Sequence, residues 1–322
     1  MTQGPQIPEG ISDKVADAPA GNWVDRFAPR PARPFLRLSR ADRPIGTWLL
    51  FIPCLWGLAL AAMGDGYRTW DLWLALSCGV GAFLMRGAGC TWNDISDRKI
   101  DAQVARTKLR PIPSGQVTVR GALVWMVLQA AIASVILFSY NRVAVVLGVA
   151  SLALVAIYPF AKRFTWWPQV FLGLAFNWGA LLAFAAHAGA VTPASGLLYL
   201  SGITWTLFYD TIYAHQDKED DAMIGVKSTA RLFGDHSRGW LLGFIMATVT
   251  LMALAIILTP FQPGDFLQPT LALTGVWAFG LHMFLALRRL DLYDPASCLL
   301  IFRGTRNGGL IAALVLAVAA WA

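Results

Sequence analysis

Two short acidic segments, NDISDRKID and DTIYAHQDKEDD, contain the residues whose types and spacing best suit chemistry. Each has two aspartates four positions apart, Asp97 with Asp101 and Asp217 with Asp221. If each preceding span continues as helix into its loop, such pairs lie about 5 to 6 Å apart on one face and repel unless a cation lies between them. Oxygen ligands favour Mg²⁺, which keeps open positions for water and phosphate. The spacing therefore predicts magnesium sites that hold a diphosphate, although either pair alone is equally consistent with a solvated acidic loop.

The two pairs recur at a fixed distance along the chain. Asp97 and Asp217 are 120 positions apart, and so are Asp101 and Asp221. A constant offset of this kind indicates an internal duplication. We expect two related halves to bring both pairs to the mouth of one central cavity, where metal ions grip a diphosphate from two sides.

Basic residues follow both acidic segments and are candidates for binding the diphosphate. They are Arg106, Lys108 and Arg110 in the first loop, and Lys227 and Arg231 in the second. The turn-forming residues Pro111–Gly115 favour a fold-back of the first loop as a lid. The alternative reading is the general excess of Lys and Arg in cytoplasmic loops of membrane proteins.

A further cluster, YPFAKRFTWWP, begins at Tyr158. We interpret Trp166 and Trp167 as anchors at the membrane interface, where tryptophan is common. Tyr158, Lys162 and Arg163 are candidates for contacting substrate, the two cations through the diphosphate.

Arg86 lies inside an apolar run, where a charge at the bilayer centre costs at least about 2.5 to 3.5 kcal/mol unless it faces a wet cavity or a partner. Helical periodicity of 100° per residue places Arg86 on the same face as Asn93, Asp97 and Asp101. We therefore predict that Arg86 lines the cavity.

The elements that must position these residues are membrane spans. The chain has 322 residues, of which 57% are hydrophobic and 14% charged, with a mean hydropathy of +0.54. A bilayer span needs about 20 apolar residues. Runs of this length occur at 45–63, 71–92, 119–139, 143–160, 169–187, 195–214, 238–259, 270–288 and 298–321. The sequence predicts an all-α polytopic protein: nine helices around a cavity, as two four-helix halves plus a ninth helix.

The charges predict an orientation and a boundary. Residues 1–34 are rich in Pro and Ala and contain four acidic residues, which indicates a disordered tail before a membrane domain at 35–322. With the amino terminus in the cytoplasm, only Arg68 and Arg142 of the basic loop residues face outward, as the positive-inside rule requires. The acidic residues argue against a transit peptide. We expect a bacterial inner membrane protein with its site on the cytoplasmic side, and the net charge of +7 needs no nucleic acid.

Several chemistries have no support. The four cysteines lie in or beside apolar runs without CxxC spacing, and the four histidines lack a ligand set, so neither zinc nor redox chemistry is indicated. The sequence has no P-loop, no GxGxxG motif and no GxSxG motif.

The motifs NDxxDxxxD and DxxxD, with five ordered segments, resemble the UbiA superfamily of intramembrane prenyltransferases, and most closely its 4-hydroxybenzoate polyprenyltransferase branch. The segments are Arg40–Gly46, Leu84–Asp94, Arg106–Gly115, Tyr158–Gln169 and Tyr209–Gly234. The resemblance implies a helical bundle open sideways to lipid, with Mg²⁺ and diphosphate at its cytoplasmic end. It implies metal-binding roles for Asn93, Asp97, Asp101, Asp217 and Asp221, and a role for Arg163 at the diphosphate or the acceptor.

The implied reaction transfers a polyprenyl group from polyprenyl diphosphate to position 3 of 4-hydroxybenzoate in ubiquinone biosynthesis. Arg86 and Arg163 are the candidates for binding the acceptor carboxylate, and Asp210 or Asp94 for a general base. The alternatives are another aromatic or tetrapyrrole acceptor, or, from a different class, a secondary transporter or divalent-cation channel. Ionisable groups of a transporter should lie near the midplane, whereas here they gather at one face.

Overall fold

The structure, a computed structural model, describes residues 19, 21–103, 107–223, 225–262 and 264–322. Within these residues, the regular secondary structure is entirely helical and there is no strand. Nine of the described helices have 19 residues or more. They are α3 (Ile45–Asp65), α4 (Thr69–Asp101), α5 (Val119–Leu137), α6 (Arg142–Phe164), α7 (Pro168–Ala188), α8 (Pro193–Ala214), α11 (Ser237–Ile257), α12 (Leu267–Arg289) and α13 (Pro295–Ala319). The predicted all-α class is confirmed, and each predicted apolar run overlaps one long helix.

Eight candidate spans, counted within the described residues, are long and apolar enough to cross a membrane. They include all the long helices except α8, which carries several Ser, Thr and Tyr residues and ends shortly after Asp210. The fourth span also differs from its predicted end at residue 160, because α6 continues through Pro159 to Phe164.

Local sequence signals explain where several of these helices begin and end. The Asn141 side chain accepts a hydrogen bond from the Ala144 N–H at the start of α6, and Thr192 and Ser195 form a capping box at α8. Gly189, with φ of 77°, ends α7 in the left-handed region that glycine adopts most readily. These caps satisfy backbone groups that lack a partner within the helix.

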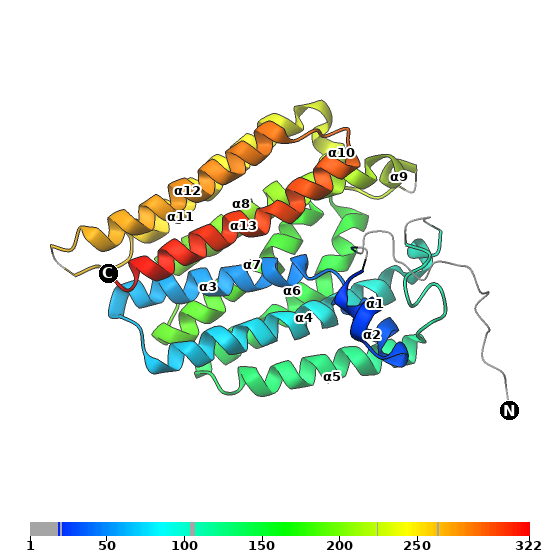
Figure 1. The fold of residues 1–322 in the computed structure, drawn as a ribbon, viewed down its shortest axis with the longest axis horizontal. Coiled ribbons are helices and arrows are strands. Elements are labelled where there is room, and N and C mark those ends of the chain that lie inside the picture. The colour runs from blue at the N-terminus through cyan, green and yellow to red at the C-terminus, as the bar shows by residue number, and fades with distance from the viewer. Residues whose placement is uncertain (1–18, 20, 104–106, 224, 263) are drawn as a thin grey trace. The chain divides into compact units, whose positions relative to one another are not determined.

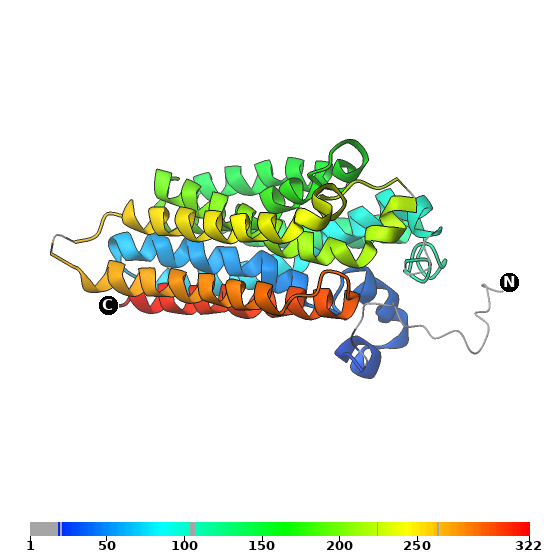
Figure 2. The ribbon, with the colours of Figure 1, turned by 90° about the horizontal axis from the view of Figure 1, so that it is seen from above.

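The chain forms two compact units, of which the larger comprises residues 45–86 and 128–322. Helices α12 and α13 pack side by side within it, α11 lies against α12, and α3 packs on α7 and α13 (Figures 1 and 2). Its core contains Trp56, Trp205 and Phe279, whose ring centroids lie 4.9 to 5.8 Å apart. Gly57 of α3 lies against the carbonyl of Ala180 in α7, where a Cβ would clash. The glycine therefore lets α3 and α7 approach closely.

The smaller unit comprises residues 1–44 and 87–127, so α4 and α5 contribute to both units. Its short helices are α1 (Trp23–Phe27), η1 (Arg30–Ala32) and α2 (Arg33–Leu38). One apolar cluster joins Leu38, Ile95, Ile112, Val117 and Ala122. This cluster fixes α2 against the end of α4 and the loop that follows it.

The disorder predicted for residues 1–34 is wrong for the described part of that segment. Helix α1 is present, Val24 is fully buried and the Trp23 indole donates to the Ala41 carbonyl at 2.7 Å. Burial alone raises the pKa of Asp25, but hydrogen bonds from Arg37 and Asn22 outweigh it and leave that pKa below its usual value. Residues 1–18 and 20 lie outside the described residues. The domain boundary at residue 35 stays a proposal.

Candidate active site

The first acidic segment forms the last turns of α4, as predicted. Asp97 and Asp101 are both in this helix and are 1% and 5% exposed, and Asp94 is fully buried. Asn93 is half-buried one residue before Asp94. The i and i+4 relation of Asp97 and Asp101 is therefore confirmed, and the charges of Asp94 and Asp97 act unfavourably on Asp101.

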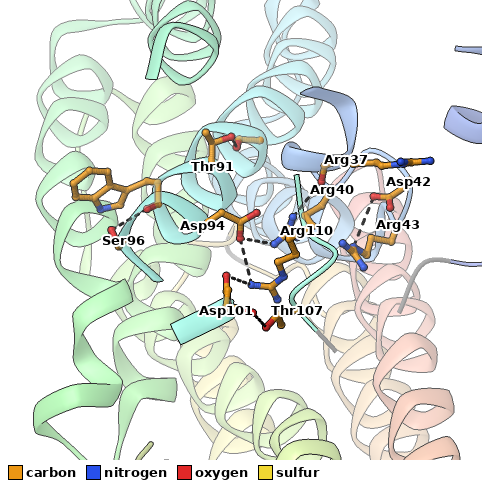
Figure 3. A network of polar contacts seen from close by, with 12 residues as sticks. Arg37, Arg40, Asp42, Arg43, Thr91, Asp94, Ser96, Asp101, Thr107 and Arg110 are labelled. Atoms are coloured by element: carbon orange, nitrogen blue, oxygen red, sulfur yellow. Dashed lines mark hydrogen bonds and ion pairs between the residues drawn. The ribbon is translucent and has the colours of Figure 1, made fainter. Parts of the chain in front are cut away.

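Two arginines of the smaller unit bind these carboxylates (Figure 3). Arg40 donates to Asp94 Oδ1 at 2.6 Å, and Arg110 donates to Asp101 Oδ2 at 2.8 Å and lies 3.4 Å from Asp94 Oδ1. These are charge-assisted bonds between buried or nearly buried groups, which makes them strong and directional. Asp94 thus lies beside two guanidinium groups, an arrangement that suits a structural partner of arginine better than a general base.

Arg40 is the residue of this site that sequence reasoning missed, because it was noted only as part of a segment that resembles the family. Its φ of 55° is in the left-handed region, which disfavours residues with a Cβ. Arg40 is nevertheless only 8% exposed, and its side chain is bonded to Asp94. The signal that could have identified Arg40 is its position in a basic stretch just before the first span, together with Asp94, a second buried charge that needs a partner.

The loop after Asp101 contains the predicted turn. The Ser114 and Gly115 N–H groups donate to the Arg110 and Ile112 carbonyls, and Gly115 has φ of 76°. Lys108 is exposed, whereas Arg110 points to carboxylates of its own unit. Arg106 lies outside the described residues. The roles of Lys108 and Arg110 at a diphosphate, and the lid, stay predictions.

The second acidic segment is built differently, and the predicted continuation of its span as helix is wrong. Helix α8 ends at Ala214, and the segment continues as η2 (His215–Asp217) and then as α9 (Lys218–Met223). Asp217 closes the 3₁₀ turn and Asp221 lies in the six-residue α9, so the pair is separated by one turn of a new short helix. Both aspartates are half-buried.

His215 begins this second segment and is buried. Its Nε2 lies 3.0 Å from Ser237 Oγ. Burial and the neighbouring charge of Lys218 lower the pKa of His215 from 6.5 to about 4, so its imidazole is neutral near pH 7.

The predicted cations of the larger unit lie around the turn that joins α6 to α7. Arg163 is exposed, with its guanidinium carbon 5.0 Å from the Phe160 ring centroid. The Lys227 ammonium donates to the Phe164 carbonyl at 3.4 Å, and the Lys227 N–H donates to the Lys162 carbonyl at 3.2 Å. The structure thus brings Lys227 to the segment that carries Tyr158, Lys162 and Arg163.

Arg86 lies in surroundings that suit a functional cation. Its guanidinium carbon is 5.1 Å from the Phe176 ring centroid, and Asp210 is close enough to interact with its charge. A Cβ at Gly46 would meet the guanidinium, so glycine leaves room for it. Among the described residues, Arg86 Nε has no hydrogen-bond partner although it is buried. A buried donor without a partner is costly, which points to a ligand that completes this site.

Among the described residues, no group of three or more acidic, histidine or cysteine side chains is arranged so that it could hold a metal ion. The metal roles of Asn93, Asp97, Asp101, Asp217 and Asp221 therefore stay predictions, as does the meeting of the two pairs around one diphosphate. All four cysteines are free and buried, as their apolar neighbours predicted.

The fold and the charged helix ends define a class: an all-helical integral membrane protein with carboxylates and arginines gathered where spans enter loops. A profile of the UbiA prenyltransferase family matches residues 50–321, and the chain belongs to this family.

The chain is similar to curated relatives over most of its length. It is 47% identical over 289 residues to the 4-hydroxybenzoate polyprenyltransferase, mitochondrial, of Bos taurus, covering 89% of this chain and 76% of the relative. The protein of that name from Homo sapiens is 45% identical over 310 residues, covering 96% and 81%. A UbiA homologue from Archaeoglobus fulgidus, described as bound to GPP and Mg²⁺, shares the fold with a TM-score of 0.64 and 22% identity, covering 89% of this chain and 98% of that one.

Proposed function

We propose that this protein transfers a polyprenyl group from polyprenyl diphosphate to position 3 of 4-hydroxybenzoate, an early membrane step of ubiquinone biosynthesis. The observation that carries this proposal is the 45 to 47% identity to mitochondrial 4-hydroxybenzoate polyprenyltransferases across 89% or more of this chain. The family match covers residues 50–321, the stretch that contains both acidic segments, and a shared reaction is the direct explanation of this similarity. The family match does not favour a transporter or a cation channel.

Mg²⁺ is the metal that the residues fit. The archaeal structural neighbour is described with Mg²⁺ bound. Here, Asp97 and Asp101 lie one helical turn apart and buried, and the charges of Asp94 and Asp97 repel that of Asp101, which is an arrangement that a hard cation stabilises. Asn93, Asp97, Asp101, Asp217 and Asp221 would hold the metal, and the bound ions would supply positive charge to the departing diphosphate.

The protein's own cations complete the binding of the diphosphate. Arg163, Lys162 and Lys227 lie on one turn and the loop bonded to it, so they bind phosphate oxygens on the side of the second acidic segment. Lys108 and Arg110 serve the first segment, and Tyr158 borders the same turn. Charge on the leaving oxygens is stabilised by these groups as the allylic C–O bond ionises.

Arg86 binds the acceptor carboxylate. Guanidinium recognises carboxylate bidentately. The Phe176 ring lies against one side of the Arg86 guanidinium, and Arg86 Nε can donate a hydrogen bond to the carboxylate. The ring carbon ortho to the hydroxyl then attacks the allylic cation and loses its proton, for which Asp210 beside Arg86 is the candidate acceptor. The apolar and aromatic core around Trp205 and Phe279 keeps water from the cation.

The proposal extends to the location within the cell, for which the charge distribution is the support. The relatives are mitochondrial by name. We propose that the amino terminus and both acidic segments lie on the cytoplasmic side of a bacterial inner membrane, an orientation that the bias of Lys and Arg supports. Labelling of single cysteines at positions 108 and 142 with a membrane-impermeant thiol reagent tests this, since only position 142 should react in intact cells.

A direct assay tests the proposed function. Membranes containing the protein are incubated with radiolabelled 4-hydroxybenzoate and a polyprenyl diphosphate, with Mg²⁺ or with EDTA. Lipid-soluble label should form only with Mg²⁺. If label forms equally with EDTA, the proposed need for Mg²⁺ is refuted. If no label forms with a polyprenyl diphosphate of any prenyl length, the proposed reaction is refuted. Homogentisate, a naphthoate and a tetrapyrrole as competing acceptors separate this reaction from the alternative within the family.

A further inference from the structure

Trp166, in the turn between α6 and α7, carries two cations on one ring. The Arg231 guanidinium carbon lies 5.3 Å from the ring centroid and the Lys227 ammonium 5.9 Å. The side chain is 38% exposed, at the rim of its unit. Two like charges repel, so a shared aromatic face is what makes their proximity favourable. A tryptophan that only anchors the protein at lipid headgroups needs no such partners.

Arg231 also holds the chain that follows the second acidic segment. Its Nη1 donates to the Asp221 carbonyl at 3.1 Å and to the Val226 carbonyl. The Val226 N–H donates to the same Asp221 carbonyl at 2.9 Å. Arg231, from α10 (Thr229–Phe233), therefore fastens the backbone at Asp221 while its other face stacks on Trp166.

Lys227 ties the same stretch to the turn from the other side. Its N–H donates to the Lys162 carbonyl at 3.2 Å and its ammonium to the Phe164 carbonyl at 3.4 Å. Helix α9 has six residues, too few for a helix to hold its conformation and direction alone. The contacts of Lys227, Arg231 and Trp166 supply that support.

We infer that Trp166 is a positioning residue: through Arg231 and Lys227 it fixes the segment that carries Asp217 and Asp221 against the turn that carries Lys162 and Arg163. The inference rests on the proposed function, since these aspartates and cations are the groups assigned to metal and diphosphate. It replaces the reading of Trp166 as an interface anchor. It also assigns Arg231 and Lys227 a backbone-holding role beside any contact with substrate.

The first test measures order without activity. Hydrogen–deuterium exchange of the peptide that covers residues 215–227 is compared in the wild type, Trp166→Leu, Trp166→Phe and Trp70→Leu, all in EDTA. Trp70 is the matched control, because it is 45% exposed and lies at the opposite end of α4 from Asp101. Exchange should be about tenfold faster in Trp166→Leu, intermediate in Trp166→Phe, which keeps an aromatic face, and unchanged in Trp70→Leu.

The second test separates positioning from general stability. In purified protein in lipid nanodiscs, Trp166→Leu should raise the Mg²⁺ concentration for half-maximal activity and the KM for polyprenyl diphosphate about tenfold. The KM for 4-hydroxybenzoate and the melting temperature should stay close to those of the wild type. Trp166→Phe should recover most of the change.

Two outcomes overturn the inference. One is an active wild type in which Trp166→Leu matches Trp70→Leu in exchange and in both constants. The other is a Trp166→Leu variant that loses melting temperature and kcat with unchanged Mg²⁺ dependence, which indicates a purely structural role. Failure of the proposed function looks different, because the wild type itself then forms no prenylated product while the exchange result still stands.

Discussion

The two acidic segments share a spacing in sequence but differ in how the structure holds them. In the first, α4 continues without interruption to Asp101, and its aspartates are deeply buried beside the guanidinium groups of Arg40 and Arg110. In the second, α8 ends at Ala214, and a 3₁₀ turn and a six-residue helix carry half-buried aspartates. The cation that follows, Arg231, donates to backbone carbonyls.

This difference shows that a repeated motif does not require a repeated mode of support. Removing a cation from the first segment leaves a buried carboxylate without compensation, which is costly in a low-dielectric setting. Removing one from the second releases a loop whose groups water can solvate. The following variants test this contrast, beginning with the largest expected effect.

Arg40→Ala should lower the free energy of unfolding by about 3 to 5 kcal/mol, because Asp94 then remains buried with fewer partners. Arg231→Ala should cost only about 1 kcal/mol. Unfolding in mixed detergent micelles measures both. Arg40→Gly is the internal control: it removes the same ion pair but adopts φ of 55° without strain, so it should be about 1 kcal/mol more stable than Arg40→Ala. Equal losses for Arg40→Ala and Arg231→Ala would remove the contrast.

Asp97→Asn and Asp217→Asn should each reduce kcat/KM by about 100-fold or more at near-normal protein levels, since both are proposed metal ligands and loss of such a ligand affects charge stabilisation directly. The two segments differ in how they are supported, but their proposed metal role is the same. We therefore expect the same loss of activity in both. Glu219→Gln, an exposed neighbour in α9, is the control for loss of negative charge alone and should stay within about threefold of the wild type. Near-normal turnover in either aspartate variant would remove that segment from the site.

Arg163→Ala should raise the KM for polyprenyl diphosphate about tenfold, because an exposed guanidinium contributes one charge-assisted contact to a phosphate. Arg163→Lys should recover part of this, since a lysine keeps the charge but not the forked geometry. Steady-state kinetics with both substrates varied provides the measurement. An increase confined to the KM for 4-hydroxybenzoate would reassign Arg163 to the acceptor carboxylate and leave Arg86 for the diphosphate.

The smallest expected effect is a pH dependence of folding stability that arises from His215, in the second acidic segment. Its pKa of about 4 in the folded protein is below the unfolded value of 6.5. The unfolded chain therefore binds the proton more readily, and stability present above pH 6.5 is lost as pH falls towards 4. The loss at pH 5 should be about 1 kcal/mol after discounting for solvent screening.

His215→Gln, which keeps a hydrogen-bonding group toward Ser237, should show a shallower decrease in thermal stability between pH 7 and pH 5. Arg40→Ala should keep the steeper pH dependence of the wild type, because its ion pair with Asp94 involves no histidine. Identical pH profiles for the wild type and His215→Gln would place the titrating group elsewhere.

Much of the candidate site was predictable, and the parts that were not have a common cause. The helical pair of Asp97 and Asp101 was predictable from its spacing, because the span before it contains no proline up to residue 101. The same reasoning failed after Ala214, where the chain leaves α8 as a 3₁₀ turn stabilised by contacts from distant residues such as Ser237. The helical order near Trp23 was also missed, because it depends on burial against Leu36 and Ala41.

The sequence by itself determined the all-helical membrane class, the long apolar spans and the charged segments at their ends, because hydrophobic length and local spacing are properties of a continuous stretch of chain. Only the tertiary structure decided which charges meet. His187 lies between Asp65 and Asp71, more than 110 positions away, at 2.6 and 2.7 Å, and Arg40 reaches Asp94 across 54 positions. Such pairs depend on how helices pack side by side, and packing brings together residues that no local pattern connects.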